Sequence, residues 1–173
     1  VGDLCVGVFM FDGDVLGVDA WRPGRDDRQA QISVAQRIAS LSVTWGRQLH
    51  EMYPDRWPDK PIPTPCIHID DSGMSGVGDI LASREMYVDR VNFGGAASGQ
   101  YPELVKAAQF KNVRTEMHWV ARRGLQEGWF RVLPHHRKLR AQLQWTHFDR
   151  EPGPSGPIIK LEPKDDVKAR HGG

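Results

Sequence analysis

Two adjacent aspartates carry the strongest chemical signal in this sequence. Asp70 and Asp71 follow the largely apolar run 66–69 and precede the segment 72–76, which reads Ser-Gly-Met-Ser-Gly. A carboxylate at the end of a buried strand, beside a tight glycine turn, is held at the sheet edge where ligands bind in α/β proteins. Hard divalent cations such as Mg²⁺ prefer one or two carboxylates completed by water and phosphate oxygens. The pattern predicts a metal site, although the same residues also suit an ordinary helix cap.

The sequence around these aspartates predicts alternating strands and helices. Residues 4–11 and 15–21 are rich in β-forming residues and flank an Asp-Gly turn, which indicates a hairpin. Apolar residues recur every three or four positions over 29–53 and 112–127, which predicts two long amphipathic helices. Further strands are expected over 66–70, 87–93, 130–133, 144–149 and 158–162, and shorter helices over 77–83, 134–143 and 165–171. This order predicts the α/β class with a mixed sheet.

The length and composition suit one globular domain. The chain has 173 residues, of which 39% are hydrophobic, enough for a sizeable core. No stretch approaches the roughly 18 to 20 uninterrupted apolar residues of a membrane helix, so no membrane partner is expected. Cys5 and Cys66 lie in strand-like apolar runs, which favours buried, reduced thiols and a cytoplasmic protein.

Basic residues concentrate between positions 106 and 140, although the formal net charge of the chain is only +1. A solvated helical face is one explanation, and a phosphate-binding surface is the other. At Arg114, which opens the second long helix, salt bridging is as plausible as a phosphate contact. The predicted DNA-binding residues are Lys111, Arg114, Arg122, Arg137 and Lys138.

The aspartate segment belongs to a series of motifs that runs along nearly the whole chain. Residues 69–76 and Asp79-Ile80-Leu81 place an aspartate at a strand end, then a glycine and a short helix. The later motifs are Arg90-Val91-Asn92-Phe93-Gly94-Gly95, the N-x-R-x-E-M helix start at 112–117, the L-x-x-Q-L helix at 139–143, and the segment 159–173. In this order they resemble the nuclease domain of bacteriophage terminase large subunits.

This resemblance implies a single RNase H-like nuclease domain over residues 1–173, with a mixed β-sheet flanked by helices. Such nucleases hold two Mg²⁺ or Mn²⁺ ions about 3.5–4 Å apart, which activate water and stabilise the leaving oxygen. By resemblance, Asp70 is the central metal ligand and Asp71 a second catalytic candidate. The implied reaction is endonucleolytic cleavage of double-stranded DNA during phage genome packaging. The implied partners are that DNA, the terminase ATPase domain, the small terminase subunit and the portal, in the cytoplasm of the infected bacterium.

The chain departs from the family pattern at both ends. Asp3 matches a non-catalytic aspartate that follows the first catalytic one, and the last motif, S-P-D-x-A-D-A, would come after Gly173. We therefore expect a fragment with one of three metal carboxylates and weak or absent cleavage. Asp3, Asp165 and Asp166 are conceivable substitutes, although the latter two suit a helix cap. No G-x-x-x-x-G-K-[ST] loop occurs, so the packaging ATPase is not expected in this chain.

Two other functions remain open. Another RNase H-like nuclease, such as a Holliday-junction resolvase, shares the metal chemistry but needs its acidic residues within the chain. A non-catalytic DNA-binding or docking module of the packaging motor is consistent with the missing carboxylates.

Among the other residues, His68 is expected in the core rather than at a metal, because it alternates with Ile67 and Ile69. Trp119 and Trp145 are expected to pack in the core rather than stack on bases.

Overall fold

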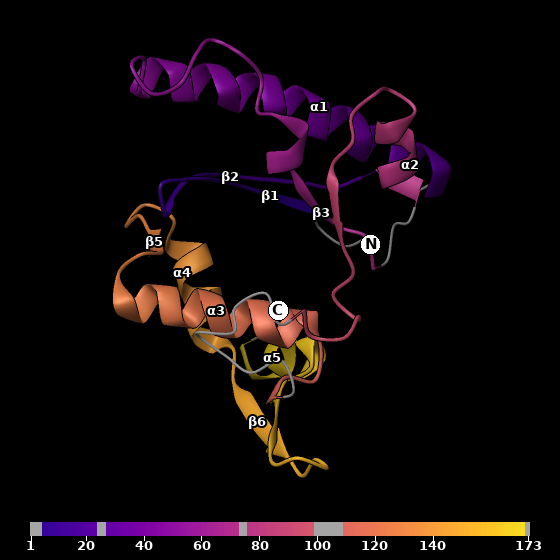
Figure 1. The fold of residues 1–173 in the computed structure, drawn as a ribbon, viewed down its shortest axis with the longest axis vertical. Coiled ribbons are helices and arrows are strands. Elements are labelled where there is room, and N and C mark those ends of the chain that lie inside the picture. Colours follow the sequence, from indigo (N-terminus) through magenta and orange to yellow (C-terminus); the bar gives the residue numbers. More distant parts are fainter. Residues whose placement is uncertain (1–4, 24–26, 73–75, 99–108, 172–173) are drawn as a thin grey trace. The chain divides into compact units, whose positions relative to one another are not determined.

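The computed structural model describes residues 5–23, 27–72, 76–98 and 109–171, and it divides the chain into two compact units (Figure 1). The first unit comprises Val1–Phe9 and Val18–Asn92, and the second comprises Met10–Gly17 and Phe93–Gly173. The tip of the predicted hairpin therefore belongs to the second unit. Within the described ranges, no helix combines the length and apolar character that a membrane span requires.

The order of elements follows the predicted alternation closely. The first unit and the hairpin contain β1 (Cys5–Phe11), β2 (Asp14–Trp21), α1 (Asp27–Met52), the 3₁₀ helix η1 (Thr64–Cys66), β3 (His68–Asp70), α2 (Gly76–Ala82) and β4 (Asp89–Val91). The second unit continues with α3 (Val113–Glu127), β5 (Arg131–Val132), α4 (Arg137–Trp145), β6 (Phe148–Glu151), β7 (Ile158–Leu161) and α5 (Lys164–His171). The described strands form three small sheets, β1-β2-β5, β3-β4 and β6-β7. The α/β class is confirmed, whereas a single RNase H-like domain with one mixed sheet stays a prediction.

The core of the first unit lies where α1, α2 and β3 meet. Figure 1 shows α2 next to one end of α1, and the two helices pack against each other. The buried residues of this core come from all three elements: Val34, Ala35, Ile69, Val77 and Leu81. This packing explains the apolar periodicity of the long helix, because the apolar face of α1 packs against α2 and β3.

β3 is shorter and more exposed than the sequence predicts. Ile69 is buried, but His68 and Asp70 on either side of it are exposed. Among the described strands, β3 pairs in parallel with β4 alone, and the side chains on its face opposite Ile69 are exposed. The prediction that His68 lies in the core is therefore wrong. Cys66, predicted to be a buried thiol, is also exposed, and it ends η1 rather than lying in a strand.

The second unit is organised around the first turn of α3. Asn112 caps this helix, because its Oδ1 accepts hydrogen bonds from Thr115 N at 3.0 Å and Thr115 Oγ1 at 2.8 Å. Thr115 Oγ1, buried, in turn accepts a hydrogen bond from Leu161 N at 3.2 Å. This chain of bonds connects α3 to β7, and the cap at Asn112 agrees with the helix start predicted at 112–117. β7 also pairs antiparallel with β6.

Candidate functional site

Asp70 ends β3 with an exposed carboxylate. Its Oδ1 accepts a hydrogen bond from Ser72 N at 2.9 Å. This is the local turn that an aspartate side chain forms with the backbone two residues on. A carboxylate accepts about four hydrogen bonds or metal contacts through its two oxygens, so this single bond orients Asp70 without using up its capacity. Asp3 and residues 73–75, at the centre of the glycine-rich segment, lie outside the described residues.

Asp71 is held by an arginine that the sequence did not single out. Arg90 of β4 places Nε and Nη2 each 3.0 Å from Asp71 Oδ2, and Nη1 2.7 Å from Asp79 Oδ1. The hydrogen bond to Asp79, followed by that to Asp71, raises the pKa of Arg90 above its ordinary value. Arg90 thus links the end of β3 to the first turn of α2, and its charge offsets part of the negative charge of the two aspartates.

Gly78 provides the space for this arginine. A Cβ at position 78 would lie 2.6 Å from Arg90 Nε and 2.8 Å from its Cζ. Any larger residue would push the guanidinium away from the backbone of α2, and the two ion pairs would be disturbed. Gly78 therefore has a structural role, because it lets Arg90 lie close to the backbone of α2.

The second oxygen of Asp71 has a different environment. Oδ1 is buried, and it has no hydrogen-bond partner among the described residues. A buried acceptor in this state is costly unless water, a cation or another donor satisfies it. Asp71 and its neighbour Asp70 offer carboxylate oxygens, and these are the kind of metal ligand that suits a hydrated Mg²⁺ or Mn²⁺ ion. Within the described ranges, no group of three or more His, Cys, Asp or Glu residues could hold a metal, and the two-metal site stays a prediction.

A histidine–aspartate pair shares the exposed face of β3 with Asp70. His68 Nδ1 lies 2.7 Å from Oδ2 of Asp89, its partner across the β3–β4 pair. His68 and Asp70 point to the same side, because alternate side chains of a strand do so. When Nδ1–H donates to a carboxylate, Nε2 becomes the nitrogen that can accept a proton. Sequence analysis missed this pair, since strand register decides which residue faces His68.

The predicted DNA-binding residues all belong to the second unit, but their environments differ. Lys111 forms an ion pair with Glu151 at 3.1 Å, and Glu151 also pairs with Lys160 at 2.8 Å. Hydrogen bonds from Lys160 and then Lys111 lower the pKa of Glu151. Arg114 is half-buried in the first turn of α3. Arg137 and Lys138 are exposed at the start of α4, where a phosphate has free access.

Arg122 lies over an aromatic cluster. Its Cζ is 5.6 Å from the ring centroid of Phe148 and 5.9 Å from that of Trp119. Trp119 also contacts Phe148 edge-on at 5.2 Å, and Phe110 at 5.9 Å. Trp119 packs against other aromatic side chains as expected, but it is only half-buried and does not belong to the buried core. The contacts favour one orientation of the Arg122 side chain through cation–π attraction.

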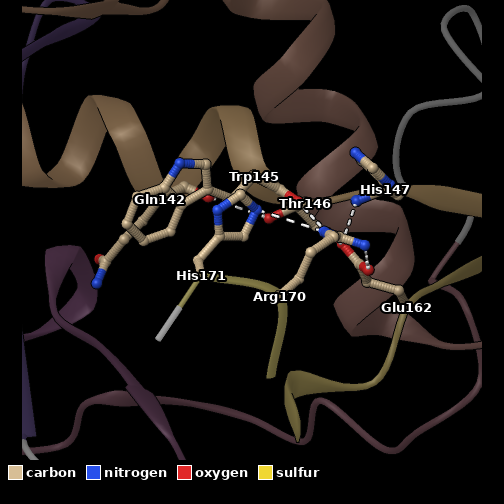
Figure 2. Close-up of polar contacts among 7 residues, drawn as sticks. All are labelled: Gln142, Trp145, Thr146, His147, Glu162, Arg170 and His171. Atoms are coloured by element: carbon tan, nitrogen blue, oxygen red, sulfur yellow. Dashed lines mark hydrogen bonds and ion pairs between the residues drawn. The ribbon is translucent and has the colours of Figure 1, made fainter. Parts of the chain in front are cut away.

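Glu162 joins α5 to the connection between α4 and β6 (Figure 2). Arg170 Nη1 and Nη2 each lie 2.8 Å from a carboxylate oxygen of Glu162, and Nη2 also donates to Trp145 O at 2.8 Å. His147 N donates to Glu162 Oε1 at 2.6 Å. The hydrogen bonds of Arg170 are the main cause that lowers the pKa of Glu162. His171 stacks on the Trp145 ring at 4.5 Å, as Figure 2 shows.

Sequence analysis did not identify this network, because it joins a strand end, a helix end and a loop. The only signal was the arginine in the last turn of the predicted helix. Asp165 and Asp166 lie in the first turn of α5, as expected for residues at a helix start.

Comparison of the chain with protein-family models, curated proteins and solved structures returned no match. The interpretation of the site therefore rests on its own residues and on the motif resemblance.

Replacing Arg90 by alanine is expected to lower the thermal stability in EDTA and to increase the stabilisation by Mn²⁺. The variant removes the charge that lies between Asp71 and Asp79, so the carboxylates gain more from a bound cation. We expect a small loss of stability, since exposed ion pairs contribute little. Melting curves with and without Mn²⁺ measure both effects. Arg84 is an exposed arginine before β4, and Arg84→Ala is the charge-matched control. An equal stabilisation of both variants by Mn²⁺ would contradict the idea that Arg90 and a cation compete for the same carboxylates.

Proposed function

We propose that this chain is an RNase H-like, divalent-cation-dependent DNA endonuclease domain of the terminase large-subunit type, with Asp70 as its metal ligand. The observation that carries the proposal is the exposed carboxylate of Asp70 at the end of β3. β3 and β4 are parallel, so their carboxyl ends meet at one edge, which is where α/β sheets bind ligands. The motif that begins at this aspartate is also the part of the sequence that resembles the family's catalytic segment.

The residues around Asp70 divide the chemistry between them. A bound Mg²⁺ or Mn²⁺ lowers the pKa of an attacking water and stabilises charge on the phosphate oxygens. Asp70 would hold the cation through Oδ2, the oxygen that Ser72 N does not engage. Asp71 follows Asp70 and points to the other side of the strand, so it remains a second candidate whose Oδ2 is bound to Arg90. Arg90 in this scheme is a positioning residue, because it fixes Asp71 and reduces repulsion among the aspartates.

His68 supplies a proton acceptor on the same face. Its Nδ1 is engaged by Asp89, so Nε2 can take a proton from a water beside Asp70. The His68 side chain is 61% exposed, which leaves it accessible to substrate and solvent. The Asp89 carboxylate orients the imidazole.

Replacing His68 by alanine is expected to slow DNA cleavage roughly tenfold to a hundredfold, less than a fully buried general base would cost, because water can substitute in part. Stabilisation of the protein by Mn²⁺ is expected to stay unchanged, since His68 does not hold the ion. Asp89→Asn, which keeps an acceptor for Nδ1–H, is expected to lose less activity than His68→Ala. Equal cleavage rates for wild type and His68→Ala would remove His68 from the mechanism.

The substrate that we propose is double-stranded DNA, cut during packaging of a phage genome in the bacterial cytoplasm. The partners proposed by resemblance are the terminase ATPase domain, the small terminase subunit and the portal. Exposed Arg137 and Lys138 in the first turn of α4 support contact with DNA phosphates.

Incubation of supercoiled plasmid with the protein in Mn²⁺, Mg²⁺ or EDTA tests the proposal. We expect at most weak nicking with Mn²⁺, since by the family resemblance only one of the three metal carboxylates is matched here, less with Mg²⁺, and none in EDTA. The Arg90–Asp71 ion pair favours one second candidate, a DNA-binding module without cleavage, because it already neutralises one of the two carboxylates. Salt-sensitive DNA binding with no cleavage at any metal concentration would support that module and overturn the nuclease.

A further inference from the structure

The second unit contains an open cavity of about 880 Å³. It is lined by residues of α3, β5, α4 and the start of β6. Small-molecule sites commonly have volumes of roughly 300–1,000 Å³, so the cavity is large enough for a nucleotide. None of its lining residues is one of the aspartates discussed above.

The charged groups of this cavity favour an anion. Among the described residues, Arg122, Arg131 and Arg140 line it together with one carboxylate, Asp149. Arg131 is already engaged, because its guanidinium binds both carboxylate oxygens of Asp14. Hydrogen bonding to Arg131 lowers the pKa of Asp14, so this pair stays charged and intact at neutral pH. Arg122 and Arg140 are the arginines left to balance Asp149 and to bind an incoming anion.

Arg122 is oriented before any ligand arrives. Phe148 lies under its guanidinium at 5.6 Å, and the edge-on contact with Trp119 fixes Phe148 in turn. Glu162 and Arg170 hold the backbone of His147, the residue before Phe148, as Figure 2 shows. A planar, pre-oriented guanidinium is suited to two hydrogen bonds to phosphate.

Other lining residues of the cavity are apolar or carry an amide. Leu125, Phe130 and Leu143 are apolar, and Gln126 and Gln144 have amide side chains. A site with arginines, an apolar wall and amide groups matches a ligand that has a phosphate and a flat, partly apolar ring with hydrogen-bonding edges. Inorganic phosphate would use only part of such a site.

We infer that this cavity binds a nucleotide, with its phosphate on Arg122 and Arg140 and its base against Leu125, Phe130 and Leu143. The nucleotide is a free one or one unit of a single strand, since both present the same groups. This binding needs no metal and no carboxylate of Asp70, so it stands or falls separately from the proposed nuclease.

His118 provides a spectroscopic reporter inside the cavity. It is half-buried, and burial, followed by the charge of Arg114, lowers its pKa. The other charged or titratable groups around the cavity are Arg122, Arg131, Arg140, His147 and Asp149. A bound phosphate is expected to raise the pKa of His118, because a nearby anion favours the imidazolium form. NMR titration of the ring protons with and without nucleotide measures this shift.

The experiment measures binding in EDTA with five probes. They are a deoxynucleoside, its 5′-monophosphate, inorganic phosphate, a short single-stranded oligonucleotide and the matching duplex. We expect the monophosphate to bind at least about tenfold more tightly than the nucleoside or phosphate alone. Tighter binding of the single strand than of the monophosphate identifies a strand as the source, and the reverse identifies a free nucleotide. A preference for the duplex over both would overturn the proposal.

Arg140→Gln and Arg122→Gln are expected to weaken monophosphate binding about tenfold each, as expected for loss of a charge-assisted contact. Arg123→Gln is the matched control: it removes the same charge from α3 but lies outside the cavity, paired with Glu127. Asp70→Asn is expected to bind the nucleotide like the wild type. Equal loss in Arg123→Gln and Arg140→Gln, or no shift of the His118 titration, would show that no cavity site exists. Arg140 is exposed, so its substitution should leave the fold intact, and melting curves verify this.

Discussion

Asp70→Asn is expected to reduce metal-dependent DNA cleavage by more than about a hundredfold. Loss of a residue that only orients a metal ligand typically lowers metal affinity or activity about 10- to 100-fold, and loss of a direct ligand should cost more. The substitution keeps the shape of the side chain and its acceptor for Ser72 N. It removes the negative charge, which is what a hard cation requires from a direct ligand. The local turn should therefore survive while cation binding is lost. Plasmid cleavage in Mn²⁺ and melting curves with and without Mn²⁺ measure the two consequences.

Asp79→Asn is the matched control for this variant. Asp79 is an aspartate on α2 whose side chain is 72% exposed and is bonded to the same arginine as Asp71. Its amide can still accept from Arg90, so we expect nearly full activity. If Asp70→Asn cleaved DNA as fast as Asp79→Asn, with the same Mn²⁺ dependence, Asp70 would not be the metal ligand. A loss of cleavage in Asp70→Asn without a loss of Mn²⁺ stabilisation would also contradict its role as ligand.

Local sequence signals predicted the elements with the clearest periodicity or capping. α1 was expected over 29–53 and spans Asp27–Met52, because its apolar face repeats with the helical period over many turns. The start of α3 was predicted at Asn112, whose side chain satisfies backbone N–H groups within its own first turn. The hairpin turn was also predicted, and Asp12 and Gly13 both have positive φ there. These features depend on neighbours in sequence, so sequence suffices to find them.

The candidate site was predicted only as far as its local part. The place of Asp70 at a strand end follows from the run before it, and the structure bears this out. The partners of the site are not local: Arg90 reaches Asp71 and Asp79 because β4 is parallel to β3. His68 was misplaced for the same reason, since burial of a strand face depends on what covers it. Apolar neighbours such as Ile67 and Ile69 therefore indicated a buried strand where the side chains of one face are exposed.

Arg170→Ala is expected to destabilise the protein clearly more than the loss of an exposed ion pair, because it removes both charged hydrogen bonds from a buried carboxylate. The Glu162 side chain is only 6% exposed, and its remaining partner is the N–H of His147. The melting temperature should fall as well. Urea unfolding at neutral pH measures the loss. Arg123→Ala removes an exposed helical ion pair instead, and it should cost less than about 0.5 kcal/mol.

The pH dependence of the same variant separates the ion pair with Glu162 from the hydrogen bond to Trp145 O. Arg170 lowers the pKa of Glu162 below its ordinary value of 4.5 in the folded protein. The unfolded chain therefore binds more protons than the folded one in this range, and stability falls as the pH drops through the lowered pKa. In Arg170→Ala this part of the acid loss should disappear, which makes the stability curve flatter below about pH 5. Glu162→Gln should show the same flattening, and the double variant should lose less than the sum of the two, because the partners act on each other. Parallel acid curves for wild type and both variants would mean that Arg170 stabilises α5 through its hydrogen bond to Trp145 O and not through Glu162.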